Sequence, residues 1–148
     1  MRRLTEARLL AQPIDDVFAY LADFSNGPDW DPGVRDARRA ESGPVTVGNV
    51  FLLNVRFGGQ TLPMRYTLLT HEAPHLLVFE GTSKTSRVRD TIWLAPEPTG
   101  GTRITWTLEL ELLGVNRLGE PFVGPALRRL GRVALDGLTT RCARPLFR

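Results

Sequence analysis

Apolar and polar residues alternate along most of the chain between Val34 and Gly114. A period near two predicts β-strands that have one apolar face. The pair Gly58-Gly59 interrupts the alternation and predicts a tight turn, so the two flanking segments should form a hairpin. The residues in the apolar phase of this hairpin are Phe51, Leu53, Val55 and Phe57, followed by Leu62, Met64, Tyr66 and Leu68.

Three further strands are expected after the turn "HEAPH" at residues 71–75. The first is "LLVFEGT", and the other two lie on either side of "PEPTGG". In the last of them Ile104, Trp106, Leu108 and Leu110 share one face, whereas charged residues and threonines share the other. One face of this sheet must therefore be covered, and the other faces water.

Helical spacing appears only near the two ends of the chain. A short strand over Thr5–Ala11 leads into a helix, and "DFSNGPDWDPGV" then allows one short helical turn before Trp30. A long C-terminal helix is predicted to cover the sheet, because apolar residues recur there at helical intervals. The positions that define the two helices are Ile14, Val17, Phe18 and Leu21, and then Val123, Leu127, Leu130, Ala134 and Leu138.

The order of these elements predicts an α+β fold with helices packed on one face of an antiparallel sheet. The 148 residues suit a single domain spanning 1–148. The lone Cys142 favours a reducing compartment, and no apolar run resembles a secretory signal or a membrane span, so we expect a cytoplasmic protein. The net charge of +3 is spread among acidic residues, and Arg128, Arg129 and Arg132 are interpreted as a solvated helix face, which argues against nucleic-acid binding.

Four segments resemble the polyketide cyclase/dehydrase-like branch of the SRPBCC superfamily, also called START-like or helix-grip proteins. They are "AQPIDDVFAYLADFSNGPDWDPGV", "YTLLTHEAPHLLVFEGTS", "GGTRITWTLELELLG" and "PALRRLGRVALDGL". The resemblance implies a curved seven-stranded antiparallel sheet wrapped around the long C-terminal helix, with two short helices between strands 1 and 2. It also implies a cavity for apolar or aromatic ligands between the sheet and that helix.

Inward-facing apolar and aromatic residues are the candidates for ligand binding, although any one of them could simply fill the core. Asp90 shares its phase with Val88 and Ile92, so its carboxylate should face the interior as a polar anchor, unless it lies at the strand end or pairs with Arg65. Tyr66 and Asp90 are also the candidate catalytic residues. The complete set of ligand-binding candidates is Phe57, Met64, Tyr66, Phe79, Asp90, Trp106, Leu108, Leu127 and Leu130.

Several other polar and aromatic residues are given structural interpretations. The orientation of Glu80 remains open, because two apolar phases compete on its strand, and Trp30 is favoured as the anchor of its corner. Glu6 and Arg8 on the first strand are expected to form solvated pairs with Glu109 and Glu111 on the outer face. His71 and His75 belong to a proline-containing turn, so we expect no metal and no cofactor.

The leading hypothesis is therefore the binding of a hydrophobic, aromatic polyketide-like or lipid-like molecule by a monomer or homodimer. One alternative is an aromatase/cyclase or dehydratase acting on a polyketide-like substrate, which the resemblance favours more than any visible catalytic motif does. A second alternative is a regulatory or toxin-like interaction protein that uses its basic helix and outer sheet face.

Overall fold

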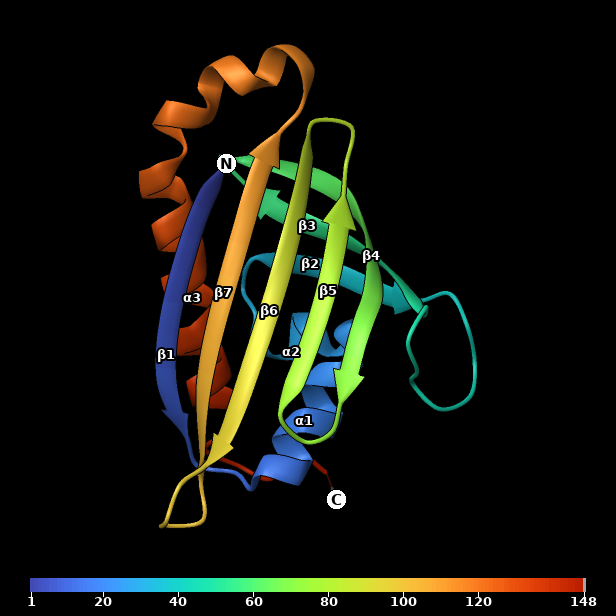
Figure 1. The fold of residues 1–148 in the computed structure, drawn as a ribbon, viewed down its shortest axis with the longest axis vertical. Helices are drawn as coiled ribbons and strands as arrows, with labels where there is room; N and C mark the ends of the chain where they lie inside the picture. Colours follow the sequence, from blue (N-terminus) through green and yellow to red (C-terminus); the bar gives the residue numbers. More distant parts are fainter. Residues whose placement is uncertain (148) are drawn as a thin grey trace.

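The computed structural model describes residues 1–147 and contains one antiparallel sheet with helices on its concave side (Figure 1). The strands are β1 (Arg2–Leu10), β2 (Val34–Arg39), β3 (Val50–Phe57), β4 (Gln60–Glu72), β5 (Leu76–Thr82), β6 (Ser86–Pro96) and β7 (Thr102–Leu112). The α-helices are α1 (Ile14–Ala22), α2 (Gly27–Trp30) and α3 (Gly124–Arg141), and the 3₁₀ helices are η1 (Phe24–Asn26) and η2 (Gly114–Phe122).

The seven strands follow the order β1-β7-β6-β5-β4-β3-β2, so the first and last strands of the chain lie side by side. Register shifts between Val34 and Asp36 and between Leu68 and Thr70 interrupt the ladders of β2 and β4. Such irregularities bend a strand and increase its twist, which helps the sheet to curve around α3. The predicted α+β helix-grip fold, with short helices between strands 1 and 2, is confirmed.

The hairpin and strand phases predicted from alternation are also present. Gly58 and Gly59 both have positive φ at the β3–β4 turn, a conformation that glycine adopts without strain. On β6 the residues Val88, Asp90 and Ile92 are all buried, as their shared phase predicts. β1 extends from Arg2 to Leu10 rather than over Thr5–Ala11, because its pairing with β7 begins at Arg2 and Leu110.

Helix α3 packs closely against β1 and α2, and glycines make this approach possible. A Cβ atom added at Gly131 would overlap the side chain of Leu4, and one added at Gly137 would overlap the backbone carbonyl of Trp30. Leu127, Leu135 and Leu138 are the buried leucines of this helix. The predicted apolar stripe contains Leu127 and Leu138 but not Leu135.

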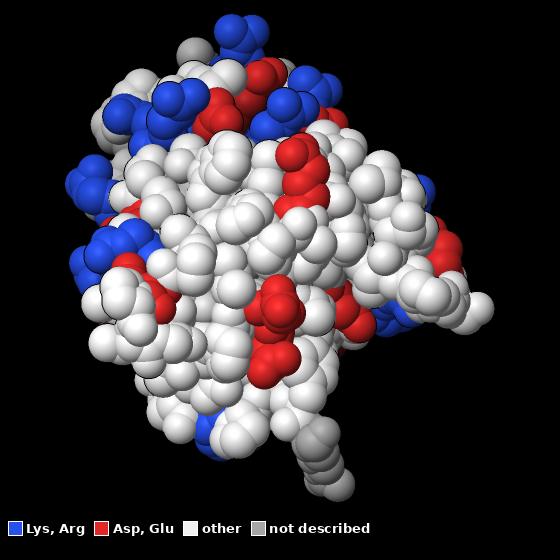
Figure 2. Space-filling model, turned by 60° about the horizontal axis from the view of Figure 1, so that its bottom comes forward, with Lys and Arg blue, Asp and Glu red and all other residues white. Residues whose placement is uncertain are grey.

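Charge is distributed unevenly over the surface. Figure 2 brings the lower end of the view in Figure 1 forward and shows a largely uncharged surface with acidic groups near its middle and basic groups along its edges. Arg128, Arg129 and Arg132 are exposed on α3, as expected for a solvated helix face. Among residues 1–147, no helix is both long and apolar enough to cross a membrane.

Candidate functional site

A cavity of about 90 Å³ lies between the concave face of the sheet and α3. A cavity needs roughly 10–15 Å³ of such volume to hold one water molecule. The cavity is therefore large enough for several waters or for part of a small organic molecule. Its lining consists of Leu4, Glu6, Phe24, Gly27, Trp30, Asp31, Val34, Leu53, Val55, Tyr66, Asp90, Trp106, Leu108, Leu127, Leu130, Gly131, Ala134 and Leu135.

Six of the nine predicted ligand-binding residues come together in this lining. The strands β4, β6 and β7 contribute Tyr66, Asp90, Trp106 and Leu108, and α3 contributes Leu127 and Leu130. The strand residues reach the same space because their side chains alternate toward the concave face, and the helix residues reach it from the opposite side. Their contact with a ligand remains a prediction.

The other three predicted residues lie outside the lining. Phe79 is fully buried and stacks on Phe24 with a centroid separation of 3.9 Å, so it supports the cavity wall from behind. Met64 is buried within the core, and Phe57 is half-buried at the end of β3. A direct ligand contact by these three side chains also remains a prediction.

Asp90 supplies a buried carboxyl group to the cavity. Its side chain is 3% exposed, and Trp106 Nε1 donates a 2.8 Å hydrogen bond to its Oδ1 atom. Burial, followed by the nearby charge of Asp31, raises the pKa of Asp90 to about 7, although the bond from Trp106 acts in the opposite direction. Asp90 is thus neither at a solvated strand end nor paired with Arg65, because the only polar partner found among the described residues is Trp106.

Asp31 is a second carboxyl group in the lining, and it was absent from the predicted site. It follows α2 in extended backbone, and its Oδ1 atom accepts a 2.8 Å hydrogen bond from the backbone N–H of Gly33. Burial raises the pKa of Asp31 to about 6. Two carboxyl groups that titrate close to neutral pH therefore share one cavity.

Tyr66 adds a phenol to the same wall. Its ring lies directly over Gly81, its cross-strand partner on β5, where a Cβ atom would collide with the ring. Burial raises the pKa of Tyr66 well above its usual value, with the charges of Asp90 and Asp31 as further causes. No hydrogen bond to the Tyr66 hydroxyl is found among the described residues, so this group is available to a molecule in the cavity.

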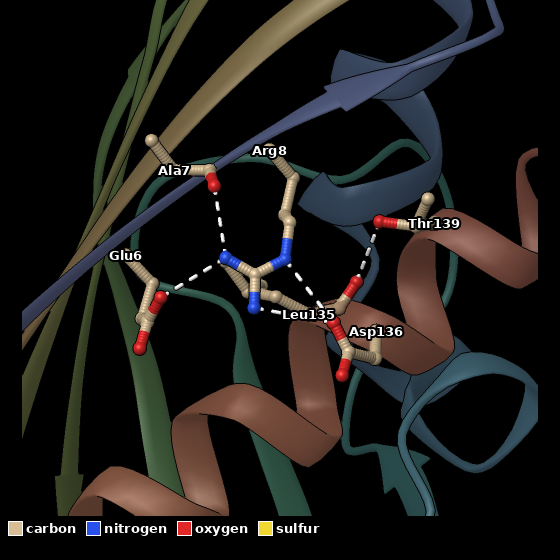
Figure 3. A network of polar contacts seen from close by, with 6 residues as sticks. All are labelled: Glu6, Ala7, Arg8, Leu135, Asp136 and Thr139. Carbon is tan, nitrogen blue, oxygen red and sulfur yellow. Dashed lines mark hydrogen bonds and ion pairs between the residues drawn. The ribbon is translucent and has the colours of Figure 1, made fainter.

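Glu6 and Arg8 face the interior, and the prediction that they lie on the outer face is wrong. Glu6 is paired in register with Trp106, and Arg8 with Ile104, so both share the concave side with these residues. Arg8 forms ion pairs with Glu6 at 3.0 Å and with Asp136 of α3 at 3.1 Å (Figure 3). This polar network ties β1 to α3 beside the cavity and places the Glu6 side chain in its lining.

The corner before β2 is fastened to α3 by another polar cluster. Arg141 Nε donates a 2.7 Å hydrogen bond to Asp29 Oδ2, which also accepts a hydrogen bond from the Tyr20 hydroxyl. The Arg141 guanidinium also lies 5.5 Å from the centre of the Tyr20 ring, within the range of a cation–π interaction. Trp30, in the same corner, is buried and also lines the cavity, so it has the cavity position that was the less favoured of its two interpretations.

The remaining charged and histidine candidates play no part in the cavity. Glu80 points outward and forms a 2.8 Å ion pair with Arg89 on β6. His71 packs edge-on against Phe18, and His75 Nδ1 lies 3.2 Å from the backbone oxygen of Leu94. Within residues 1–147, no three His, Cys, Asp or Glu side chains are grouped so that they could hold a metal ion.

A curved sheet that encloses a cavity beneath a long C-terminal helix defines the helix-grip class of proteins. The model of the family described as "Polyketide cyclase / dehydrase and lipid transport" matches residues 1–143. The chain belongs to this family. A comparison with curated protein sequences gave no match.

Solved structures of similar fold include an enzyme and proteins named only by their superfamily. The Zhui aromatase/cyclase from Streptomyces sp. R1128 superposes with a TM-score of 0.81 at 15% identity, covering 97% of this chain and 94% of that one. A START superfamily protein from Mycobacterium smegmatis gives a TM-score of 0.74 at 14% identity, covering 94% and 97%. At these identities the likeness shows a shared fold.

Proposed function

We propose that the chain binds a hydrophobic small molecule, of aromatic polyketide-like or lipid-like character, in the cavity between the sheet and α3. The observation that carries this proposal is the open volume of about 90 Å³ beneath α3, lined mainly by apolar side chains. Protein interiors are otherwise packed as closely as organic crystals, and voids larger than a few waters are uncommon. An apolar pocket with a few well-placed polar groups is the usual form of a small-molecule site.

Leu108 and Thr107 offer a matched test of this proposal. Leu108 lines the cavity from β7, whereas Thr107 faces outward, where its hydroxyl lies 3.1 Å from that of Thr5. Leu108→Trp should fill the cavity and weaken the binding of 2-naphthylmethanol, an uncharged aromatic probe, by at least about tenfold, since tenfold corresponds to 1.4 kcal/mol. Thr107→Trp adds the same ring to the opposite face and should leave the binding unchanged.

Isothermal titration calorimetry gives the affinities, and circular dichroism checks that each variant is folded. If Leu108→Trp does not fold, Ala134→Leu provides a smaller insertion from the α3 side of the same cavity. Equal binding by the wild type and by a folded cavity-filling variant would show that the probe binds elsewhere. That result would overturn the proposal.

Proton-transfer catalysis is the second candidate function, and the pair of cavity carboxyls favours it. Acid–base groups are most effective when their pKa lies near the working pH, as it does for Asp90 at about 7 and Asp31 at about 6. An ionised carboxylate could remove a proton from the carbon next to one carbonyl group, and that carbon then bonds to a second carbonyl carbon, whose oxygen takes up the proton and becomes a hydroxyl group. In the loss of water, an ionised carboxylate could remove a second proton from the first carbon, while a protonated carboxyl or the Tyr66 hydroxyl gives a proton to the new hydroxyl group, which leaves as water.

Turnover of a poly-β-ketone thioester mimic, followed by liquid chromatography and mass spectrometry, tests this second function. We expect Asp90→Asn to reduce ring closure by about 100-fold or more, the lower end of typical general acid–base contributions. Tyr66→Phe should reduce the loss of water. Unchanged turnover in both variants would remove these two residues from the mechanism.

A further inference from the structure

The charged residues in the cavity lining are all acidic. Glu6, Asp31 and Asp90 contribute carboxyl groups, whereas no lysine, arginine or histidine among residues 1–147 belongs to the lining. Glu6 has a counterion in Arg8, at 3.0 Å, which it shares with Asp136. Among the described residues, Asp31 and Asp90 form no ion pair with a basic side chain, so their charges have no counterion.

Polar atoms that accept hydrogen bonds also remain free in this space. Within the part of the chain that the structure describes, Asp90 accepts a hydrogen bond only at Oδ1, from Trp106, and Asp31 only at Oδ1, from Gly33. The hydroxyl of Tyr66, a side chain that is 8% exposed, has no partner among the described residues. A guest that donates hydrogen bonds would therefore find three acceptors around one apolar cavity.

Aromatic rings form much of the remaining wall. Trp30 and Trp106 have ring centroids 5.5 Å apart with a tilt of 50°, and Phe24 lies 5.1 Å from the Tyr66 ring and 6.4 Å from that of Trp106. The face of an aromatic ring carries partial negative charge and attracts cations, and tryptophan does so most strongly. The rings and the carboxyl groups thus favour the same sign of charge.

We propose that the cavity selects a guest whose apolar body carries a protonated amine, with the ammonium group beside Asp31 and Asp90. This inference rests on the proposed function, because it specifies the chemical class of the molecule bound at that site. An ammonium group supplies both the missing counterion and several N–H donors. A guest bearing a carboxylate would instead place a third negative charge close to two others, which is unfavourable in a desolvated site.

Three probes that share a naphthalene body test the selection. They are 2-naphthylmethylamine, 2-naphthylmethanol and 2-naphthoate, titrated separately into the intact protein by calorimetry at about pH 7.5, where the amine is protonated. We expect the amine to bind at least about tenfold more tightly than the alcohol, and the carboxylate to bind most weakly. Tenfold corresponds to 1.4 kcal/mol, which is close to the lower end of the range for one hydrogen bond to a charged group.

Variants connect the selection to the two carboxyl groups. In Asp90→Asn and Asp31→Asn the ratio of amine to alcohol affinity should fall toward one, because each loses a negative charge with little change of shape. Glu72→Gln, which removes an exposed carboxylate at the end of β4, should keep the wild-type ratio. If one aspartate variant does not fold, the other still gives the ratio.

The possible results separate this inference from the proposed function. If the alcohol binds in the cavity as tightly as the amine, or the carboxylate binds best, the amine selectivity is overturned while the cavity remains a binding site. If the ratio stays at the wild-type value in both aspartate variants, the carboxyl groups do not cause the selection, and the inference is overturned. If none of the three probes binds, the proposed function itself fails.

Discussion

Trp106 and Asp90 meet diagonally across two neighbouring strands, with the indole Nε1 donating a 2.8 Å hydrogen bond to the carboxylate Oδ1. Their direct cross-strand partners are Ile92 and Leu108, so the contact depends on the reach of the tryptophan side chain. Because the carboxyl group is buried, this bond is the main interaction that stabilises its charged form. The Trp106–Asp90 hydrogen bond therefore both links β6 to β7 and influences the protonation of a carboxyl group in the cavity.

Removal of this donor should destabilise the protein. Trp106→Phe keeps an aromatic ring but leaves Asp90 without its hydrogen bond, and we expect the free energy of unfolding to fall by about 1–3 kcal/mol. Trp93→Phe is the matched control, because Trp93 lies on the outer face of β6 and is 51% exposed. Urea unfolding at neutral pH measures both variants, and an equal loss in the two would contradict the importance of the Trp106–Asp90 bond.

Stability should decrease as the pH rises through the acidic range. The pKa of Asp90 is raised from 3.8 to about 7 and that of Asp31 from 3.8 to about 6, so the folded protein holds these protons more tightly than the unfolded chain. Each group therefore lowers the free energy of unfolding between about pH 4 and its folded pKa, by at most about 1.4 kcal/mol per pH unit. The decrease should end above about pH 7.

Unfolding by urea at a series of pH values tests this dependence. Asp90→Asn should flatten the curve between about pH 5 and 7, because the variant has no titrating group at that position. Glu72→Gln, at an exposed position, is the control and should retain the wild-type slope. A wild-type slope in Asp90→Asn would mean that other groups cause the pH dependence.

The close packing of α3 on the corner before β2 also gives a prediction. Gly137→Ala introduces a Cβ atom where the carbonyl oxygen of Trp30 lies, and backbone must move to make room. Although alanine favours helix by about 1 kcal/mol, we expect a net loss of about 1–3 kcal/mol from overpacking. Gly119→Ala has open space around its Cβ position, and thermal unfolding should show little change in that control.

Much of the sheet could be predicted from the sequence, because alternating apolar and polar residues indicate strands with one covered face. The β3–β4 hairpin followed from Gly58-Gly59, and the inward orientation of Asp90 followed from its phase with Val88 and Ile92. The phase of β5 stayed open, since apolar residues occupy both of its faces near the turn. Its register with β6 places Phe79 beside Asp90 and so turns Glu80 outward.

The parts of the site that were missed depend on contacts distant in the sequence. Glu6 and Arg8 have the polarity of an outer face, yet their register with β7 turns them inward, where Asp136 of α3 completes the charge pairing. Asp31 is buried because α3 and the sheet pack around the corner before β2. No local sequence pattern predicts this burial. Tyr66 was predicted from its strand phase, and Gly81 is a second local signal for it, because a glycine within a strand often marks a close approach.

The location of the guest molecule is the central claim, and a crystal structure with 2-bromonaphthalene tests it most directly. Anomalous scattering locates the bromine atom without reference to the shape of the electron density. We expect the bromine between Trp106 and Leu130, within the volume bounded by the sheet and α3. Bromine found only on the outer surface, with the side chains of the protein filling the space beneath α3, would contradict the account.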